Sequence, residues 1–403
     1  MHVIYSKQIV TPKTVQSGYL VIEDGKIKDL LTEYEGPFID YSDAVILPGF
    51  IDQHTHGWGR GSFLYENNEK SIRMMIEDQA KEGVTGFLAT TFTDSLDNIF
   101  QSLEVINKVQ SSPHKGTKLL GVHLEGPFLN PEFGGAQKVE HCLLPNLELM
   151  QRFLEYGQPH NFIKLITIAP ELAGAQAVIE YCRSQNIQVA AGHTGATFEE
   201  LLTSKIWGVS GVTHMYSAMT GLHHRQPGVV GAALYDADLY CEFAKQTGIT
   251  VRHEVFDFTY RLKGADKIIM TTDCLGNGMQ VEPYYHARRN VHFIPKPGYL
   301  IERFEDGTEK IYDLNDYESL RDIELSFVGS IRNVLKYTPM SWNDLAKITS
   351  TNSANYLNLP SKGTIEVGKD ADFTIITPDV EVIATIVEGE WVYETNPSEL
   401  SRP

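Results

Sequence analysis

The stretch VILPGFIDQHTH, residues 45–56, joins an apolar β segment to two histidines that are separated by one residue. Side chains two positions apart on a strand point to the same side. His54 and His56 are therefore expected to face the same space at the end of a strand. The pattern His-x-His is frequent by chance, so its meaning depends on what the rest of the chain places beside it.

Beyond residue 56 the sequence alternates between apolar stretches and amphipathic helical stretches. Such alternation is typical of βαβ units around a parallel sheet. Roughly eight such units in about 300 residues predict a (β/α)8 barrel of the TIM type. Strands are predicted at residues 84–91, 118–125, 163–169, 187–193, 211–214 and 267–273, and helices at residues 69–81, 147–156, 173–185 and 199–207.

Both ends of the chain are made of short β segments rich in Val, Ile and Tyr. Each group is too short to bury a face alone, so we expect the two to pair. The predicted fold class is α/β, a barrel with a small β-sandwich domain built from both chain termini. The predicted division is residues 1–48 plus 359–403 for the β domain and 49–358 for the barrel. An insertion at about 276–326 is expected to lie over the mouth of the barrel, where long loops commonly carry function.

Titratable residues recur where the predicted strands end, and chemistry in a barrel gathers at the C-terminal ends of its strands. One histidine at a strand end is more often a satisfied polar residue than a ligand. The coincidence of several at different strand ends favours a metal site. Imidazole and carboxylate together are typical of Zn, Fe, Co or Mn rather than of Mg or Ca alone. These strand-end residues are His54, His56, His123, Glu125, His193, His214 and Asp273.

The composition excludes several classes of protein. The 403 residues carry 34 Lys and Arg against 52 Asp and Glu, a formal net charge of −18. Nucleic acids and anionic membranes require a basic surface, so neither is expected as the main partner. No apolar stretch is long enough for a membrane helix, and no secretory signal is visible. Four cysteines without CxxC spacing do not indicate a disulfide framework. We expect a cytoplasmic protein.

The motifs quoted so far resemble those of a known family. VILPGFIDQHTH and GTIEVGKDADF, residues 363–373, are similar to the flanking signatures of the amidohydrolase superfamily. Within it, the chain resembles the N-acetylglucosamine-6-phosphate deacetylases over nearly its whole length. The stretches that carry this resemblance are GVHLEGPFLNPEFGGAQ, AAGHTGAT, GVTHMYSAM, HHRQPGVVGAAL and TTDC. LEGPF and HHRxPGVVG are specific to that group, whereas HxH and GKDAD mark only the superfamily.

The resemblance implies a reaction and a set of roles. The reaction would be metal-dependent deacetylation of N-acetylglucosamine 6-phosphate to glucosamine 6-phosphate and acetate, in amino-sugar catabolism. Asp273 would be the catalytic acid and base. One or two divalent ions per chain would be held by the principal ligands Glu125, His193 and His214, and by His54 and His56 where a second ion is bound. Substrate would contact Ala136, Gln137, Ser217, Ala218, His224, Arg225, Thr250, Val328 and Gly329. The family also implies a homodimer, in which Arg225 binds the phosphate in the neighbouring subunit's site.

Three departures from the family pattern affect substrate recognition. Ser217 stands where the family has an asparagine. The segment 244–251 is one residue longer than its family counterpart, and Thr250 replaces a substrate-binding histidine. Residues 327–330 read FVGS where the family has LAGS. Another N-acyl hexosamine, such as N-acetylgalactosamine 6-phosphate, therefore remains an alternative substrate.

Two other classes of function stay open at this point. A different amide hydrolase of the superfamily is one. Many cyclic amidases use a carboxylated lysine on their fourth strand, but the stretch 163–170 offers only Lys164, at its start. A non-catalytic binding protein is the other, and it is disfavoured because Asp273 and every predicted metal ligand are present together.

Overall fold

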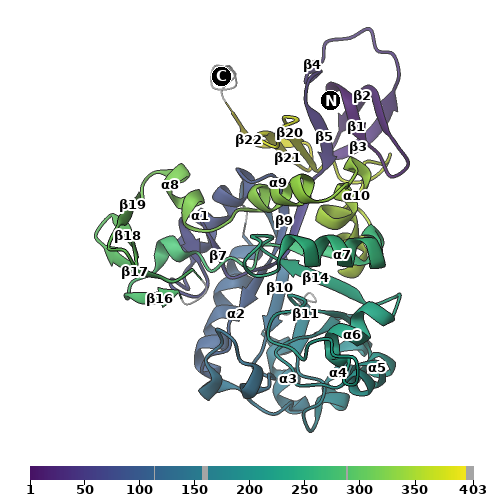
Figure 1. Cartoon of the computed structure of the whole chain (residues 1–403). Helices are drawn as coiled ribbons and strands as arrows, with labels where there is room; N and C mark the ends of the chain where they lie inside the picture. Colours follow the sequence, from purple (N-terminus) through teal and green to yellow (C-terminus); the bar gives the residue numbers. More distant parts are fainter. Residues whose placement is uncertain (113, 157–161, 287–288, 396–403) are drawn as a thin grey trace.

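A computed structural model describes residues 1–112, 114–156, 162–286 and 289–395 of the chain. Two eight-stranded sheets dominate these residues, one parallel and one mixed, and a smaller antiparallel sheet stands beside the first. Figure 1 shows the mixed sheet above the helices and strands of the larger body. In the part of the chain described here, no helix is long and apolar enough to cross a membrane.

The parallel sheet is a barrel whose strands follow one another in sequence order. Its strands are β6 (Phe50–Thr55), β9 (Val84–Thr91), β10 (Lys118–Glu125), β11 (Ile163–Ile168), β12 (Gln188–Ala191), β13 (Val209–Val212), β14 (Tyr240–Ala244) and β15 (Ile268–Thr271). All eight residues of β9 are buried, as expected for a parallel strand that is covered on both faces.

The barrel closes where its first and last strands meet. The backbone N–H of Asp273 donates to the carbonyl of His54 over 2.7 Å. The Thr272 hydroxyl donates to the Asp52 carboxylate over 2.6 Å. Burial raises the pKa of Asp52 to about 7, although the hydrogen bonds from Thr272 act to lower it. Because these bonds lie at the C-terminal end of the barrel, they hold the predicted acid and base, Asp273, beside the histidines of β6.

Helices connect the barrel strands and begin at polar caps. Thr197 and Glu200 form a reciprocal capping box at the start of α5 (Phe198–Trp207), which satisfies backbone donors that a helix start leaves free. The other helices between barrel strands are α1 (Glu69–Ala80), α2 (Leu96–Gln110), α3 (Leu147–Glu155), α4 (Ala175–Ser184), α6 (Gly228–Tyr235) and α7 (His253–Lys263). Beyond β15 come α8 (Tyr317–Ile323), α9 (Phe327–Tyr337), α10 (Trp342–Ala346) and α11 (Asn352–Tyr356).

The mixed sheet is built from both ends of the chain. Its strands run in the order β22-β21-β20-β5-β1-β2-β3, and β4 pairs with β1. The join between the two ends is the antiparallel pair of β5 and β20, in which Ile46 faces Ile375. In Figure 1 the purple N-terminal strands and the yellow C-terminal strands lie side by side. The bounds are β1 (His2–Val10), β2 (Val15–Glu23), β3 (Lys26–Leu31), β4 (Ile39–Asp40), β5 (Val45–Pro48), β20 (Phe373–Ile376), β21 (Val382–Val387) and β22 (Glu390–Glu394).

The fold class predicted from the sequence, a (β/α)8 barrel with a small β domain from both termini, is confirmed. The predicted strands and helices occur within a few residues of their expected bounds. The sequence interpretation did not include β14, a short strand with the sequence YCEFA. This omission matters for the site because β14 carries Glu242.

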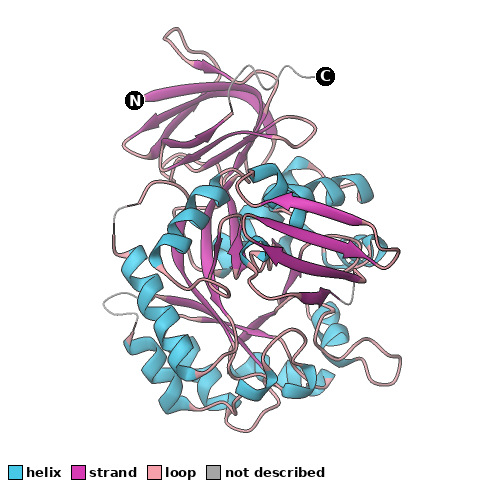
Figure 2. Cartoon of the chain, turned by 90° about the vertical axis from the view of Figure 1, so that its left-hand side faces the viewer, coloured by secondary structure: helices cyan, strands magenta, loops and turns pink. Residues whose placement is uncertain are grey.

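The residues after β15 form a small unit with a core of its own. The antiparallel strands β16 (Tyr284–His286), β17 (Val291–Lys296), β18 (Tyr299–Phe304) and β19 (Glu309–Asp313) follow one another in the sheet. Phe293, Tyr312 and Leu320 are buried between this sheet and α8. Figure 2 shows this sheet facing the viewer, in front of the barrel. Two further strands, β7 (Gly57–Trp58) and β8 (Gly61–Ser62), form a hairpin after β6.

Candidate metal centre

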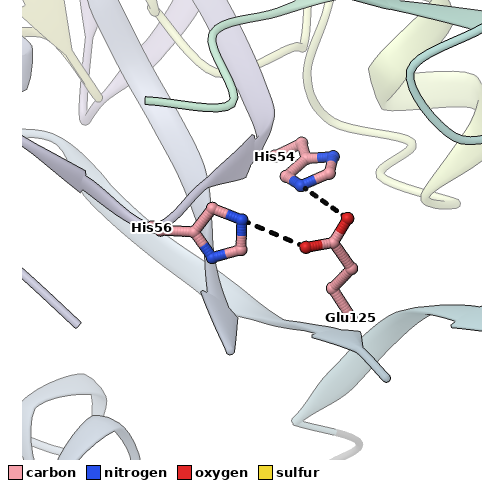
Figure 3. A group of neighbouring side chains, drawn as sticks. All are labelled: His54, His56 and Glu125. Atoms are coloured by element: carbon pink, nitrogen blue, oxygen red, sulfur yellow. Dashed lines mark ion pairs between the residues drawn. The ribbon is translucent and has the colours of Figure 1, made fainter. Parts of the chain in front are cut away.

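The carboxylate of Glu125, at the end of β10, lies at the centre of a cluster of histidines. Its Oε1 is 3.4 Å from Nε2 of His54, and its Oε2 is 3.1 Å from Nε2 of His56. Figure 3 shows both rings, which come from β6 and the residue that follows it, pointing at the two oxygens. The ligand atoms of His54, His56 and Glu125 all lie within 4.8 Å of one another, which is compatible with one metal ion.

A second group of three shares the same carboxylate. Glu125 Oε1 is 3.2 Å from Nε2 of His193 and 3.2 Å from Nε2 of His214. The two histidine nitrogens are 3.0 Å apart. His193 follows β12 and His214 follows β13, so the group spans neighbouring strand ends of the barrel. Glu125 therefore stands between two groups of potential ligands, all of them buried.

The outer nitrogen of each ring fixes which nitrogen faces the cluster. Nδ1 of His56 lies 3.1 Å from the carbonyl of Thr90, and Nδ1 of His193 lies 3.0 Å from that of Phe133. A carbonyl oxygen only accepts, so Nδ1 carries a proton, and in the neutral ring that binds a metal Nε2 is left with a lone pair. The same holds for His214, whose Nδ1 lies 3.2 Å from the carbonyl of Ser217.

These lone pairs make the cluster fit a cation. With Nδ1 protonated, His193 and His214 bring two Nε2 lone pairs to within 3.0 Å of each other. Nε2 of His54 is buried without a hydrogen-bond partner among the described residues. A metal ion would accept the facing lone pairs of His193 and His214 and would give Nε2 of His54 a partner. A hydrogen bond to the outer nitrogen of the ring is the usual support of a histidine ligand. The donor set of four imidazoles and one carboxylate suits a divalent transition metal.

The charges of the cluster also favour a bound cation. Burial lowers the pKa of His54, but Glu125, Asp273 and Glu242 outweigh it and raise the pKa well above its ordinary value. Burial raises the pKa of Asp273, but His54 and His56 outweigh it and lower the pKa below its usual range. The buried carboxylates Glu125 and Glu242 and the partly exposed Asp273 thus favour positive charge in this space, which a divalent cation would supply.

The backbone is strained where it presents these residues. His193, His214, Lys245 and Asp273 each follow a barrel strand, and their φ angles are +49°, +33°, +39° and +46°. Residues other than glycine rarely adopt positive φ, and each such residue costs about 1–3 kcal/mol. Four consecutive strand ends share this conformation. Lys245 therefore belongs structurally to the same ring as the predicted ligands and Asp273.

Glu242, on β14, is the functional residue that the sequence interpretation missed. Its Oε1 is 2.8 Å from Nδ1 of His54, and its Oε2 accepts 2.8 Å from the Gln53 amide. The backbone N–H of His214 also donates to Oε1 over 3.2 Å. Glu242 is buried, orients the ring of His54 and holds the backbone of His214, so it contacts one residue from each ligand group. The signal in the sequence was an acidic residue inside the apolar stretch LYCEFA.

We expect Glu242→Gln to weaken metal binding by about 10- to 100-fold, the usual cost of losing the outer partner of a histidine ligand. The amide of a glutamine at this position would point its N–H2 group at one of the hydrogen-bond donors that now bond to the Glu242 carboxylate. The affinity for Zn²⁺ or Co²⁺ can be measured by competition with a chromophoric chelator. A matched control is Glu302→Gln, which changes another buried glutamate, on β18 and bonded to Tyr312. Equal affinity in the Glu242 variant and the wild type would contradict the assigned role.

His123 lies beside the cluster but has a different role. Its ring is 4.5 Å from that of His54 between centroids. Its Nε2 lies 2.7 Å from the Thr167 hydroxyl. Burial and the neighbouring His54 lower the pKa of His123 to about 3, so the ring is neutral. It fills the barrel interior under His54.

Some of the predicted substrate-binding residues lie against the cluster. The Gln137 amide donates to Glu125 Oε2 over 2.6 Å, and its carbonyl oxygen accepts from the backbone of Thr93 over 2.8 Å. Ser217 supplies the carbonyl that orients His214. Ala218 has a φ of +52° and accepts from the backbone of Thr194. Ala136 is exposed beside Gln137.

The other predicted substrate-binding residues are not brought to the cluster by any contact among the described residues. His224 and Arg225 are exposed on the loop before α6. The Thr250 hydroxyl donates to the carbonyl of Lys245 over 2.7 Å, so it is used in shaping its own loop. At the start of α9, the amide of Val328 faces Glu82 over 3.4 Å and that of Gly329 donates to Ser326 over 3.0 Å. Their roles in substrate binding stay predictions.

Comparisons with known proteins show which family the chain matches. The sequence model of the Amidohydrolase family matches residues 45–392. N-acetylglucosamine-6-phosphate deacetylase of Bacillus subtilis (strain 168) is 33% identical over 387 residues, which cover 94% of this chain and 93% of that protein. N-acetylgalactosamine-6-phosphate deacetylase of Escherichia coli O157:H7 is 26% identical, with 96% and 98% of the two chains covered.

A solved structure extends the likeness to the fold. N-acetylglucosamine-6-phosphate deacetylase from Thermotoga maritima superposes with a TM-score of 0.77 at 30% identity. The match covers 98% of this chain and 100% of that one. Members of such a family share a metal-binding barrel, which agrees with the two ligand groups around Glu125. On its sequence, its fold and the relatives it matches, the chain belongs to the amidohydrolase family.

Proposed function

We propose that this protein hydrolyses the acetamido group of N-acetylglucosamine 6-phosphate, releasing glucosamine 6-phosphate and acetate in amino-sugar catabolism. The observation that carries the proposal is the position of Asp273. Its Oδ1 lies 3.4 Å from Nε2 of His54 and 3.3 Å from Nε2 of His56. An ionised carboxylate thus stands beside the predicted metal ligands, where amide hydrolysis requires a proton acceptor.

The cofactor is a divalent transition metal, with one or two ions per chain and Zn, Fe, Co or Mn as candidates. Glu125, His193 and His214 would hold the principal ion, and His54 and His56 a second one together with Glu125. When bound, the metal supplies Lewis acidity and lowers the pKa of water toward 7. Every other part of the reaction is carried by side chains of this chain.

Asp273 moves the proton in the proposed reaction. It accepts a proton from the attacking water as the water oxygen bonds to the acyl carbon. It then delivers this proton to the amide nitrogen as the C–N bond breaks, so that the amine leaves neutral. Gln137 holds the Glu125 carboxylate in place through its 2.6 Å hydrogen bond. No serine or cysteine nucleophile is required.

The experiment that tests the function is acetate release from a panel of N-acetylated hexosamines, each with and without the 6-phosphate. We expect N-acetylglucosamine 6-phosphate to give the highest kcat/KM. The second candidate, N-acetylgalactosamine 6-phosphate, is favoured by the relative from Escherichia coli O157:H7 and by the change at Thr250. Release of acetate from none of the panel would rule out both.

We further propose a homodimer in the cytoplasm. The cytoplasmic location is supported by the four cysteines, all of which are free, as in proteins of reducing compartments. The dimer is supported by Arg225, which is exposed and has no contact with the charge cluster among the described residues of its own chain. In the proposed dimer, Arg225 would bind the phosphate of the substrate in the neighbouring subunit's site, as the resemblance implies.

Arg225→Ala is expected to raise KM strongly for 6-phosphorylated substrates and to change it little for unphosphorylated ones. A charge-assisted contact between arginine and phosphate is about twice as strong as a neutral hydrogen bond. Steady-state kinetics on both substrate forms measures the effect. In mixed dimers of Arg225→Ala and Asp273→Asn subunits, one site combines an intact Asp273 with the partner's intact arginine. Some activity should therefore return on mixing, and none would return if Arg225 served its own chain.

A further inference from the structure

The short segment from Asp273 to Asn277 carries the proposed acid and base out of the barrel. On its inner side it is bonded to the backbone of β6 and the residues after it. Asp273 donates to the carbonyl of His54 over 2.7 Å. The carbonyl of Cys274 accepts from the N–H groups of His56 and Gly57 over 2.8 and 2.9 Å. Asp273 and the predicted ligand His56 are thus tied through one stretch of backbone.

On its outer side the same segment is held by Glu324, at the end of the insertion. One oxygen of Glu324 accepts from the backbone N–H of Leu275 over 2.9 Å. The other accepts from the backbone N–H of Asn277 over 2.8 Å. The Glu324 side chain is only 5% exposed. Two amides that follow Asp273 by two and four residues therefore depend on one buried carboxylate.

Lys245 supplies the positive charge that this carboxylate requires. Its ammonium donates to Glu324 Oε1 over 2.9 Å, and its side chain is 18% exposed. A buried carboxylate without a cation is costly, so the pair acts as a unit. Lys245 stands at the end of β14, between the strand ends of His214 and Asp273, and like both it has a positive φ. The pair therefore links the ring of strand-end residues to the insertion.

We propose that Lys245 and Glu324 are positioning residues for Asp273, and that the insertion serves the reaction by holding the segment 273–277 in place. This inference rests on the proposed function, since it assigns Asp273 the proton transfer. In this role both side chains act through the backbone of the segment and not on the reacting atoms. Their contribution is the fixed distance between the Asp273 carboxylate and the ligands on β6, which general acid–base catalysis requires.

The first test measures the segment itself, without substrate. Lys245→Met keeps the length of the side chain and removes its charge, and Glu324→Gln removes the charge of the carboxylate. Hydrogen exchange by mass spectrometry or NMR should show faster exchange for the amides of Leu275 and Asn277 in both variants. Lys245→Arg should restore wild-type exchange. Exchange at the wild-type rate in Lys245→Met and Glu324→Gln would overturn the proposal.

The second test measures catalysis with metal-loaded protein on N-acetylglucosamine 6-phosphate. We expect Lys245→Met to lower kcat at least tenfold, with KM within about twofold of the wild type and unchanged metal content. In an Asp273→Asn background the same change should cost less than about twofold, because its effect passes through Asp273. The proposal would be overturned if Lys245→Met lowered kcat in the Asp273→Asn protein by the same factor as in the wild type. It would also be overturned if Lys245→Met changed only KM, or if the variant lost metal.

A matched control is Lys205→Met, which breaks an ion pair to Asp236 of 2.6 Å between α5 and the residue after α6. It should leave kcat unchanged.

The experiments also distinguish failure of the proposed function from failure of the positioning role. If the wild type releases acetate from no N-acetylhexosamine, the proposed function is wrong and Lys245 has no reaction to serve, whatever the exchange rates show. If the wild type is active and the exchange or the kinetic cycle fails, only the positioning role is wrong.

Discussion

Glu125→Gln is expected to remove the bound metal, whether one ion or two, and to lower hydrolysis by at least about 10³-fold. The Glu125 carboxylate lies within 3.4 Å of a nitrogen of each of the four histidines. A glutamine keeps the volume but offers one acceptor oxygen, and its N–H2 would face ligand nitrogens that now face a carboxylate oxygen. Metal ions contribute several kcal/mol of transition-state stabilisation, and each 1.36 kcal/mol is a factor of ten in rate.

Two measurements on the same preparation check this result. Elemental analysis gives the metal content per chain, and acetate release gives the rate. Chelation of the wild type should abolish hydrolysis, and returning Zn²⁺, Co²⁺ or Mn²⁺ should restore it. The Glu302→Gln variant should retain its metal because its carboxylate is bonded to Tyr312 in the core of the insertion and not to a predicted metal ligand. Full activity in metal-free protein would contradict the whole mechanism.

Asp273→Asn is expected to lower kcat by at least about 10²-fold, the usual scale for the loss of a general acid and base. Asparagine keeps the size of the side chain and tolerates the left-handed backbone at this position, where φ is +46°. The backbone bond to His54 is unaffected by the change. The fold and the principal metal site should therefore persist while proton transfer is lost.

Metal content separates this variant from Glu125→Gln. Asp273→Asn should hold as much metal at the principal site as the wild type, with KM close to normal, whereas Glu125→Gln should hold little. Steady-state kinetics and elemental analysis on the two variants decide between them. Near-normal turnover in Asp273→Asn would mean that another group moves the proton.

The sequence predicted much of this architecture because strand ends can be recognised without a structure. A histidine or carboxylate directly after an apolar stretch is visible in the chain, and the barrel brings all such ends to one side. This reasoning gave Glu125, His193 and His214 among the candidate ligands. The family resemblance grouped these three, and the structure places their ligand atoms together. The same reasoning included His123, which the structure turns toward Thr167.

Contacts between distant residues were beyond such reasoning. Glu242 lies inside a strand of five residues, too short to show a period, and its partner His54 is 188 positions away. Lys245 and Glu324 are 79 positions apart, and no local pattern pairs them. Local patterns show where a strand ends. They do not show which side chain across the barrel will orient the residue at that end.

The pairing of β5 with β20 also has a consequence for how the protein is made. Val45, Ile46 and Leu47 are fully buried in the finished sheet, and on one side their strand is completed by residues Phe373 to Ile376. At about 5–20 residues per second, a ribosome needs roughly 15 to 60 seconds to synthesise the intervening barrel. Throughout that time β5 presents an apolar open edge, the kind of surface that pairs with other chains. Truncation before residue 373 would make this exposure permanent, so nascent and shortened chains should depend on chaperones far more than the completed protein does.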